Sequence, residues 1–326
     1  LRLRDHPAFA AAVRAGGPVV PVFIWAPEED APWPPGAASR WWLHQSLRAL
    51  GAALESRGSG LVLRTGPSAE ALEGLVRETG AEAVYFSARY EPAALARDEA
   101  VTARLRAMGG AVHPFHAGLL LDPGETHTRQ GTPFQVFTPF WKSSLAAAEF
   151  PEPLPAPREL APPERLPAGL PLERLDLEPV PDWAGGLRAA WRPGEEAAHD
   201  ALARFLDEAL AAYADARDWP GTRGTSRMSP YLHFGEISPR ALWSAVRRHA
   251  ALAREAGLVR GEEAYLRQVA WREFGHHLLV HFPHTDAAPL RPEFEAFPWR
   301  EDPAGLRAWQ RGRTGYPLVD AGMREL

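Results

Sequence analysis

A proline-rich segment in the middle of the chain separates two regions with different sequence patterns. Residues 151–194 contain 11 prolines in 44 positions, and proline neither donates a backbone hydrogen bond nor continues a helix. We therefore expect a long connector here rather than regular secondary structure. Before the connector, short apolar runs alternate with amphipathic stretches, whereas only helical periodicity follows it. With 326 residues and 45% hydrophobic content, the chain can bury a large core and is expected to form two domains.

The region before the connector is predicted to be an α/β domain. Apolar runs predict strands at 19–25, 61–65, 83–87 and 111–115, and amphipathic stretches predict helices at 38–57, 68–79 and 92–108. This βαβαβ order is typical of a Rossmann-like parallel sheet that helices cover on both faces. No GxGxxG motif follows any of the strands, so we do not expect a nicotinamide site.

The region after the connector is predicted to be entirely helical. Its apolar periodicity predicts helices at 195–216, 238–256, 262–281 and 303–311. We therefore expect an α/β domain over residues 1–120, a connector over 121–194 and an all-α domain over 195–326.

Composition excludes several kinds of site. The chain has no cysteine, which excludes disulfides, thiolate metal sites and cysteine nucleophiles and makes the cytoplasm the default compartment. No run of about 18 apolar residues predicts a membrane span. The net charge of −5 is unevenly divided, because residues 217–326 carry 16 arginines against 13 acids and residues 1–216 carry 20 basic against 28 acidic residues. The later region is therefore the better candidate for contacting phosphates.

A turn rich in glycine and hydroxyl side chains precedes one of the helical stretches. The segment 221–230 reads GTRGTSRMSP, and backbone N–H groups and hydroxyls at such a turn can hold a phosphate or pyrophosphate. Ordinary helix capping by Ser226 or Ser229 explains the same residues, so the spacing leaves both interpretations open.

The helix predicted over 262–281 has two different faces. Its buried stripe is predicted to comprise Leu266, Val269, Ala270, Phe274 and Leu278. A second face carries Gln268, Trp271, Arg272 and Gly275, which together offer an amide, a large aromatic ring, a guanidinium group and a gap. Such a face can stack on an extrahelical base and contact a phosphate. A tryptophan packed at a domain boundary beside a surface arginine fits the same pattern.

Two histidines on this helix, His277 and His281, are four residues apart. The spacing could place two metal ligands on one face, but no HExxH motif and no obvious third ligand accompany them. We therefore expect no metal.

Several ordered motifs resemble those of the DNA photolyase and cryptochrome family. The opening residues LRLRDHP resemble the end of its first strand and the following turn, and QVFTPF at 135–140 is similar to its domain-joining segment. The run from Tyr213 to Pro239 resembles the flavin-phosphate region. WREF at 271–274, FPW at 297–299 and the final GRTGYPLVDAGMREL continue in family order. The chain begins without methionine and ends within a helical pattern, and the resemblance implies a fragment that lacks the first strand and the last part of the FAD domain.

The resemblance implies an FAD-binding helical domain and assigns residues to it. The residues that would hold the FAD phosphates are Tyr213, Thr225, Ser226, Arg227, Met228, Ser229 and Arg272. Trp299 matches the exposed end of a tryptophan chain through which light reduces the flavin. Glu91 matches an acid that contacts the antenna chromophore, for which methenyltetrahydrofolate is expected.

The resemblance also implies a substrate and an activity. Trp271 matches the aromatic residue that packs on a flipped pyrimidine dimer, and Arg217 matches a basic position near the phosphates of the lesion. The implied enzyme is a deoxyribodipyrimidine photo-lyase, a monomer that repairs cyclobutane dimers in ultraviolet-damaged DNA by electron transfer from reduced FAD. Gln268 departs from this pattern, since cyclobutane-dimer enzymes commonly carry glutamate there. A cryptochrome light receptor, a (6-4) photolyase and a general nucleotide-binding α/β protein are therefore the alternatives.

Overall fold

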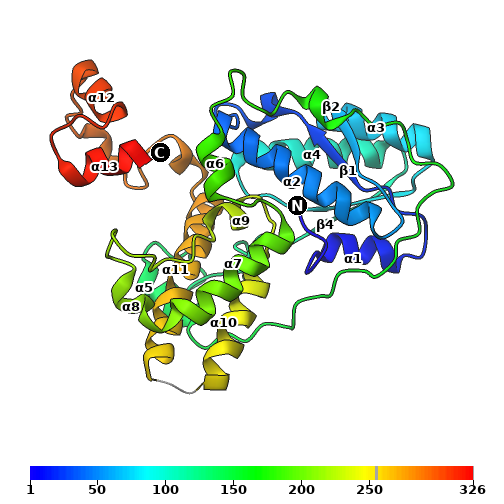
Figure 1. Ribbon diagram of the computed structural model, residues 1–326. Helices are drawn as coiled ribbons and strands as arrows, with labels where there is room; N and C mark the ends of the chain where they lie inside the picture. The colour runs from blue at the N-terminus through cyan, green and yellow to red at the C-terminus, as the bar shows by residue number, and fades with distance from the viewer. Residues whose placement is uncertain (254–255, 326) are drawn as a thin grey trace. The chain divides into compact units, whose positions relative to one another are not determined.

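The computed structural model describes residues 1–253 and 256–325, so Arg254 and Glu255 of the expected helix 238–256, together with Leu326, lie outside the described residues. The chain forms two compact units, Leu1–Pro283 and His284–Leu326. Within the larger unit, the strands and first helices (blue to cyan) group together, and the later helices (green to yellow) form a second group (Figure 1). Among the described residues, no helix combines the length and the apolar character needed to cross a membrane.

The β-structure of the larger unit is parallel. Strand β1 (Val22–Trp25) pairs with β2 (Val62–Thr65), and β3 (Ala83–Ser87) pairs with β4 (Ala111–Phe115). The predicted strand positions and the parallel direction are confirmed. The four strands form two separate two-stranded sheets, whereas the sequence pattern predicted one sheet. In the described residues, no strand ladder joins the β1–β2 pair to the β3–β4 pair.

Four helices accompany these strands: α1 (Pro7–Arg14), α2 (Ala37–Glu55), α3 (Ser68–Thr79) and α4 (Pro92–Ala107). The last three agree with the prediction to within two residues. Helix α1 was not predicted, although its start carries two local signals. Pro7 occupies the first turn, where its missing N–H is not needed, and the imidazole Nδ1 of His6 accepts a hydrogen bond from the backbone N–H of Phe9.

The proline-rich connector lies along the α/β part of the larger unit and contributes backbone hydrogen bonds. Its Leu170 N–H donates to the carbonyl of Leu63 in β2 at 3.0 Å, and its Ala161 carbonyl accepts from Val19 N–H at 2.9 Å. Apart from a single 3-10 turn at Leu172–Leu175 and the short helix α6 (Gly185–Ala190), the described residues of 151–194 form no helix or strand. The predicted connector is therefore held in place by hydrogen bonds to the α/β part and not by regular secondary structure of its own.

The second group of elements in the larger unit packs around one large apolar core. That core contains Trp42 of α2 as well as residues of the later helices. These later elements are α5 (Phe137–Phe140), a π-helical turn (Trp141–Leu145), α7 (Glu195–Glu208), α8 (Tyr213–Ala216), α9 (Ser229–His233), α10 (Pro239–Ala253) and α11 (Ala256–His281).

The predicted helix 195–216 is broken in the structure. Helix α7 ends at Glu208, a 3-10 turn covers Leu210–Ala212, and α8 begins at Tyr213. The cause lies in α11, which crosses this turn closely: a Cβ atom at Gly261 would lie 1.8 Å from the Leu210 carbonyl oxygen. Only glycine permits this approach, and the turn displaces α8 from the axis of α7.

A buried carboxylate joins the two groups of elements. The Glu236 side chain is 0% exposed and accepts hydrogen bonds from Trp42 Nε1, Ser46 Oγ and the backbone N–H of Gly194. Burial raises the pKa of this carboxyl above its ordinary value, and the three donors oppose that rise. A second tie pairs the buried Asp5 with Arg240. The α/β part and the helical part of the larger unit are therefore held in a fixed arrangement.

The smaller unit consists of short helices that side chains cap. It begins within a 3-10 turn at Pro283–Asp286 and contains another at Pro292–Ala296, followed by α12 (Pro303–Gln310) and α13 (Pro317–Glu325). Asp302 caps α12 by accepting from Gly305 N–H at 2.8 Å, and Asp320 accepts from Thr314 N–H at 2.7 Å and Gly315 N–H at 3.0 Å. The predicted helix 303–311 is confirmed, and the helical pattern expected at the end of the chain corresponds to α13.

Candidate functional site

The glycine and hydroxyl turn before α9 is fixed in a compact form. A Cβ atom at Gly224 would lie 2.5 Å from the Ala216 carbonyl oxygen, so glycine is required where the turn crosses the end of α8. Met228 is buried and anchors the turn, while Thr225 and Ser229 are exposed. The turn thus offers hydroxyl groups on its outer side, as a phosphate site requires.

An aromatic cluster supports the turn from within. Tyr265 of α11 donates a hydrogen bond from its hydroxyl to Ser226 Oγ at 3.0 Å, and Ser226 Oγ accepts a second one from Met228 N–H at 3.3 Å. The Tyr265 ring packs edge-on against Tyr213 at 5.1 Å and lies 4.6 Å from the Phe205 ring. Sequence reasoning found Tyr213 but missed Tyr265, although it lies three residues before Gln268 on the same helix.

Arg227 adopts an unusual backbone conformation in this turn. Its φ of 54° lies in the left-handed region, which costs a non-glycine residue about 1 kcal/mol or more. Its guanidinium carbon lies 3.8 Å from the ring centre of Trp191, which packs in turn on Trp42 at 5.4 Å. This cation–π contact offsets part of the strain. The contact of Trp191 with Arg227 could not be predicted from the sequence, because the two residues are 36 positions apart.

Arg217 lies at the end of α8, next to the turn. Its Nε is buried without a hydrogen-bond partner, and a carboxylate oxygen of Asp218 is 3.6 Å away. Arg217 thus brings a guanidinium charge next to the turn, with Asp218 beside it. The hydroxyls of Thr225 and Ser229, the Arg217 charge and the tight Gly224 turn together suit the pyrophosphate of a dinucleotide.

The exposed face of α11 carries Gln268, Trp271 and Gly275. Of the predicted stripe, Leu266, Val269, Ala270 and Phe274 are buried on the other side, and Leu278 is partly buried against the same core. The indole of Trp271 is 49% exposed. One of its faces stacks on the Phe137 ring of α5, with 3.8 Å between ring centroids and an angle of 9° between planes. A Cβ atom at Gly275 would meet no other atom within 4 Å. The predicted aromatic face with an adjacent gap is therefore present.

Arg272 points away from that exposed face. Its guanidinium donates to the Gly118 carbonyl at 2.8 Å and lies 3.4 Å from the Glu273 carboxylate. Glu273 is buried and accepts from the backbone N–H groups of Leu120 and Leu121. Burial raises the pKa of Glu273 to about 7, although Arg272 and the two backbone donors oppose the rise. The Arg272–Glu273 pair thus ties α11 to the segment that follows β4.

Glu91, the expected antenna contact, directly precedes α4. Its carboxylate pairs with Arg89 at 3.2 Å and accepts from the backbone N–H of Tyr90. Burial opposes ionisation, but the charge and the hydrogen bond of Arg89 together with backbone N–H donors outweigh it and lower the pKa of Glu91 to about 2. Nearby, the Tyr90 hydroxyl contacts His116 Nδ1 at 2.8 Å, and His116 Nε2 lies 3.0 Å from Asp122.

The histidine pair of α11 does not provide a metal site. The Phe134 N–H donates to His277 Nε2 at 2.9 Å, so the neutral ring carries its proton on Nδ1 and has no lone pair left for a cation. Its neighbour His281 contacts the Pro123 carbonyl through Nε2 at 2.8 Å. Nowhere in the described chain do three or more potential ligands converge as a metal site requires.

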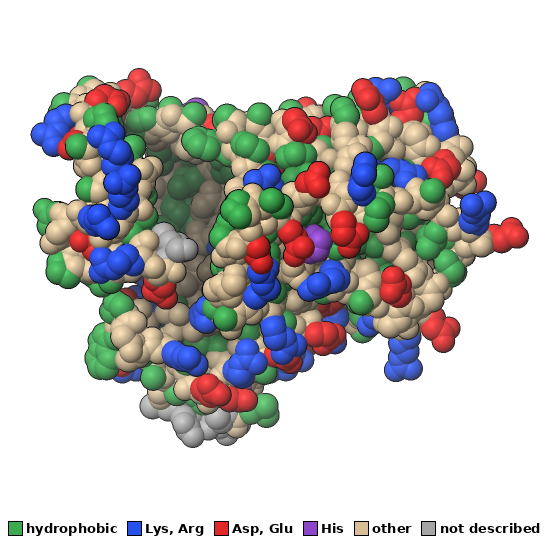
Figure 2. Space-filling model, turned by 45° about the horizontal axis from the view of Figure 1, so that its top comes forward, with side chains coloured by type: hydrophobic (Ala, Val, Ile, Leu, Met, Phe, Trp, Pro, Cys, Tyr) green, Lys and Arg blue, Asp and Glu red, His purple; other side chains and the backbone are tan. Residues whose placement is uncertain are grey.

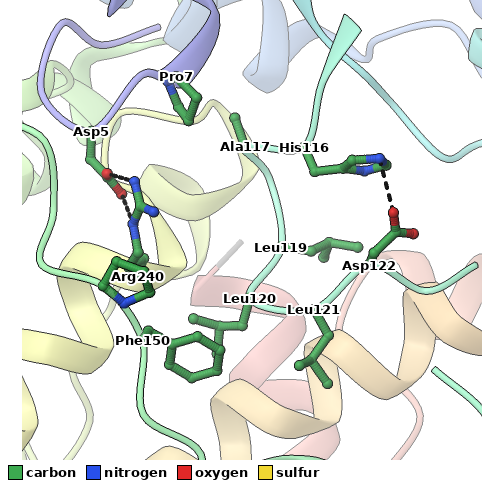
Figure 3. Close-up of a pocket in the computed structure, with 11 residues that line it drawn as sticks. Asp5, Pro7, His116, Ala117, Leu119, Leu120, Leu121, Asp122, Phe150 and Arg240 are labelled. Carbon is green, nitrogen blue, oxygen red and sulfur yellow. Dashed lines mark hydrogen bonds and ion pairs between the residues drawn. The ribbon is translucent and has the colours of Figure 1, made fainter. Parts of the chain in front are cut away.

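Two hollows lie apart from the turn before α9 and from Trp271. One is a cavity of about 140 Å³ that the Asp5–Arg240 pair borders on one side and the His116–Asp122 pair on another, with Leu120 and Phe150 between them (Figure 3). The charged groups around it already pair with one another. The second is a groove of about 370 Å³ that Phe86, Leu95 and Pro114 line beside α4. Neither hollow is lined by the turn residues or by Trp271.

Charged side chains of both signs lie on the surface of the larger unit (Figure 2), and Trp299 lies on the surface of the smaller unit. On the face of the larger unit seen in Figure 2, basic and acidic side chains are interspersed. In the smaller unit, Trp299 is 84% exposed and contacts the Phe297 ring at 4.6 Å. The expected solvent-exposed position of this indole agrees with the structure.

Comparisons with known proteins relate both ends of the chain to one family. Residues 1–158 match the family described as DNA photolyase, and residues 265–326 match the FAD binding domain of DNA photolyase. A deoxyribodipyrimidine photo-lyase of Agrobacterium fabrum is 42% identical over 100% of this chain and 67% of its own length. Cryptochrome-1 of Arabidopsis thaliana is 39% identical over 100% of this chain and 48% of its own length.

A solved structure gives the same result. The crystal structure of a bacterial class III photolyase from Agrobacterium tumefaciens superposes with a TM-score of 0.92 at 41% identity, covering 99% of this chain and 66% of that chain. The chain thus spans about two thirds of the photolyases and about half of the plant cryptochrome. The matched fold is the expected one, with an N-terminal α/β part followed by a helical FAD-binding part. On these matches, together with its parallel strand pairs, hydroxyl turn and exposed Trp271, the chain belongs to the DNA photolyase and cryptochrome family.

Proposed function

We propose that the protein is a deoxyribodipyrimidine photo-lyase that binds FAD and uses light to open cyclobutane pyrimidine dimers in ultraviolet-damaged DNA, acting as a monomer. The observation that carries the proposal is the half-exposed indole of Trp271, which lies beside Gln268 and the gap at Gly275. An uncovered aromatic face is what a base removed from the helix stacks on. The photo-lyase name of several similar proteins supports the same activity.

The turn before α9 is proposed to hold the FAD phosphates. Thr225 and Ser229 supply hydroxyl donors, Arg217 supplies a guanidinium charge, and Arg227 supplies a positive charge at the surface. Tyr213, Tyr265, Ser226 and Met228 keep the turn in shape. When bound in its reduced form, FAD supplies the electron that opens the cyclobutane ring. The protein residues supply binding, orientation and exclusion of water, as is general for cofactor enzymes.

Arg272 is proposed to support the cofactor site by holding α11 in place, and not by donating hydrogen bonds to the FAD phosphates. Its guanidinium is already bonded to the Gly118 carbonyl and lies beside Glu273. It therefore holds α11, the helix that carries Tyr265 and Trp271, against the segment that follows β4. The antenna chromophore, with methenyltetrahydrofolate as the proposed ligand, is assigned to the neighbourhood of Glu91, where Arg89 keeps the carboxylate ionised.

The proposal is tested with FAD-loaded protein on two substrates, a cyclobutane thymine dimer and a (6-4) photoproduct, in the same oligonucleotide. Light-dependent repair of the cyclobutane dimer alone is the expected result. A protein that binds another nucleotide but cannot be loaded with FAD would contradict the assignment.

Substitution of Trp271 tests the lesion site directly. Stacking of a base on an aromatic ring contributes about 1–3 kcal/mol, so Trp271→Ala should weaken binding of dimer-containing DNA by roughly one to two orders of magnitude. Undamaged DNA of the same sequence should bind nearly as before, because phosphate contacts dominate its affinity. An equal loss for both DNAs, measured by titration at one salt concentration, would show that the indole is structural.

A light receptor without repair activity is the second candidate, and Gln268 is the observation that favours it. Its side chain is exposed on the same face as Trp271, and it is an amide where cyclobutane-dimer enzymes commonly carry a carboxyl group. An amide donates and accepts hydrogen bonds but carries no charge. FAD binding without repair of either lesion would favour the receptor, and repair of the (6-4) product alone would favour the corresponding enzyme.

A further inference from the structure

The stack of Phe137 on Trp271 joins two segments that are far apart in the sequence. Phe137 begins the short helix α5, and Trp271 lies in the middle of α11. Their ring centroids are 3.8 Å apart and their planes differ by 9°. Phe137 is 5% exposed, whereas Trp271 is 49% exposed. One face of the indole is therefore covered and the other is open.

The surroundings of Phe137 prevent it from turning. The Phe274 ring packs edge-on against Phe137 at 5.9 Å and against Trp271 at 5.8 Å. The guanidinium carbon of Arg267 lies 6.0 Å from the Phe137 ring centre. Because Phe137 is fixed by its neighbours, the plane of the indole stacked on it is fixed as well.

A fixed indole plane matters for any flat ligand that binds to the open face. An exposed tryptophan without a backing ring samples several side-chain rotamers, and a ligand that stacks on it must stop that motion at an entropic cost. Phe137 removes this cost in advance, and it limits stacking to the one face that is open.

We propose that Phe137 is a positioning residue for recognition of the damaged base. It holds the Trp271 indole in the plane on which an extrahelical pyrimidine dimer stacks, and it touches neither the DNA nor the cofactor. This inference rests on the proposed function, since it assigns Phe137 a role in the selectivity of the same site for damaged over undamaged DNA.

The test compares two phenylalanines of α5. Phe137→Leu removes the backing ring, and Phe140→Leu removes a ring that is 1% exposed and packs on Phe274 and His277 instead. We expect Phe137→Leu to lower the affinity ratio of damaged to undamaged DNA by roughly 2- to 10-fold, the range of an aromatic pair. Phe140→Leu should leave the ratio unchanged, even where it lowers the melting temperature. If Phe137→Leu does not fold, Phe137→Met fills the space without an aromatic ring and carries the same expectation.

A double-mutant cycle separates positioning from general packing. In a Trp271→Ala background, Phe137→Leu should change the affinity ratio by less than about 2-fold, because its partner is gone. Full additivity, an unchanged ratio in Phe137→Leu, or an equal loss in Phe140→Leu would overturn the inference while leaving Trp271 as the lesion contact. An unchanged ratio in Trp271→Ala alone would overturn the proposed lesion site, and this inference with it.

Discussion

Single aromatic residues of this protein differ mainly in how much of each ring is left uncovered. Tyr213 and Tyr265 are buried and serve as supports for the turn. Trp271 has one covered and one open face, and Trp299 is almost fully open. Each degree of exposure suits a different role. A buried ring can support its neighbours but cannot contact a large ligand. A ring with one covered face is held in a fixed plane and can stack on a ligand, whereas a fully exposed ring is not held in a fixed plane.

Substitution of Trp299 tests its expected role in electron transfer. Trp299→Phe in the FAD-loaded protein should slow or abolish light-driven reduction of oxidised FAD, because phenylalanine is much harder to oxidise than an exposed indole. Repair by protein that was reduced beforehand should be nearly unchanged. The matched control is Trp309→Phe, which alters another partly exposed tryptophan of the smaller unit. Absorption spectra under steady blue light give the rates, and an unchanged rate in Trp299→Phe would leave this residue only a packing role.

Residue types and residue partners were not equally predictable. The exposed positions of Trp271, Gln268 and Trp299 follow from helical periodicity and motif order. The Phe137 stack, the Arg227–Trp191 contact and the bond from Arg272 to the Gly118 carbonyl could not be predicted. Each of these joins residues distant in the sequence, and no local propensity reports such a pair.

Among the elements, the crossing of α11 over the turn between α7 and α8 decides where the cofactor residues lie. Two glycines four residues apart face the turn, but they do so at different distances. A Cβ atom at Gly261 would lie 1.8 Å from the Leu210 carbonyl oxygen, whereas one at Gly257 would lie 3.4 Å from that of Ala211. The periodicity of 195–216 is that of one continuous helix, and the break was missed because its cause lies on a different helix.

The two glycines therefore predict different effects of alanine. Gly261→Ala should destabilise the protein by about 1–3 kcal/mol or more through overpacking and should weaken FAD retention, because Tyr213 and Tyr265 would separate. Gly257→Ala should be neutral or slightly stabilising, since alanine is the better helix former. Thermal unfolding and the FAD-to-protein absorbance ratio measure both effects. Equal stability of the two variants would contradict the close crossing.

The larger unit as a whole depends on buried carboxyl groups that connect its two groups of elements. Glu273 ties α11 to the segment after β4 through two backbone N–H donors, and Glu236 ties α2 to the segment between α9 and α10 and to Gly194. Burial raises the pKa of both carboxyls above the ordinary value. These ties explain why residues on both sides of the proline-rich connector form one compact unit.

A raised carboxyl pKa in the folded state gives a defined dependence of stability on pH. Because the pKa of Glu273 is about 7 in the folded protein and 4.5 for a glutamate side chain free in water, the unfolded chain binds fewer protons between these values. The contribution of Glu273 to stability is therefore unaffected below pH 4.5 and falls as the pH rises towards 7. Over this window the loss is on the order of 3 kcal/mol at most.

Replacement of the carboxyl isolates this contribution. Glu273→Gln should flatten the decrease in unfolding free energy between pH 5 and pH 7 relative to the wild type, because the amide does not titrate. Glu263→Gln, which alters an exposed acid of the same helix, should leave the pH profile unchanged. Urea titrations at several pH values give the profiles. Parallel profiles for wild type and Glu273→Gln would show that Glu273 does not hold a proton in the folded protein.

The carboxylate of Glu236 also bears on how the chain folds. Its donors on Trp42 and Ser46 are 194 and 190 positions away in sequence. Contacts between residues so far apart form only after most of the chain between them has become compact. On the ribosome, α2 is made long before Glu236 emerges, so the apolar surface of Trp42 stays uncovered during synthesis. Exposed apolar surface of this kind favours aggregation, and here it is covered when Trp191, Tyr231 and Phe234 pack on Trp42.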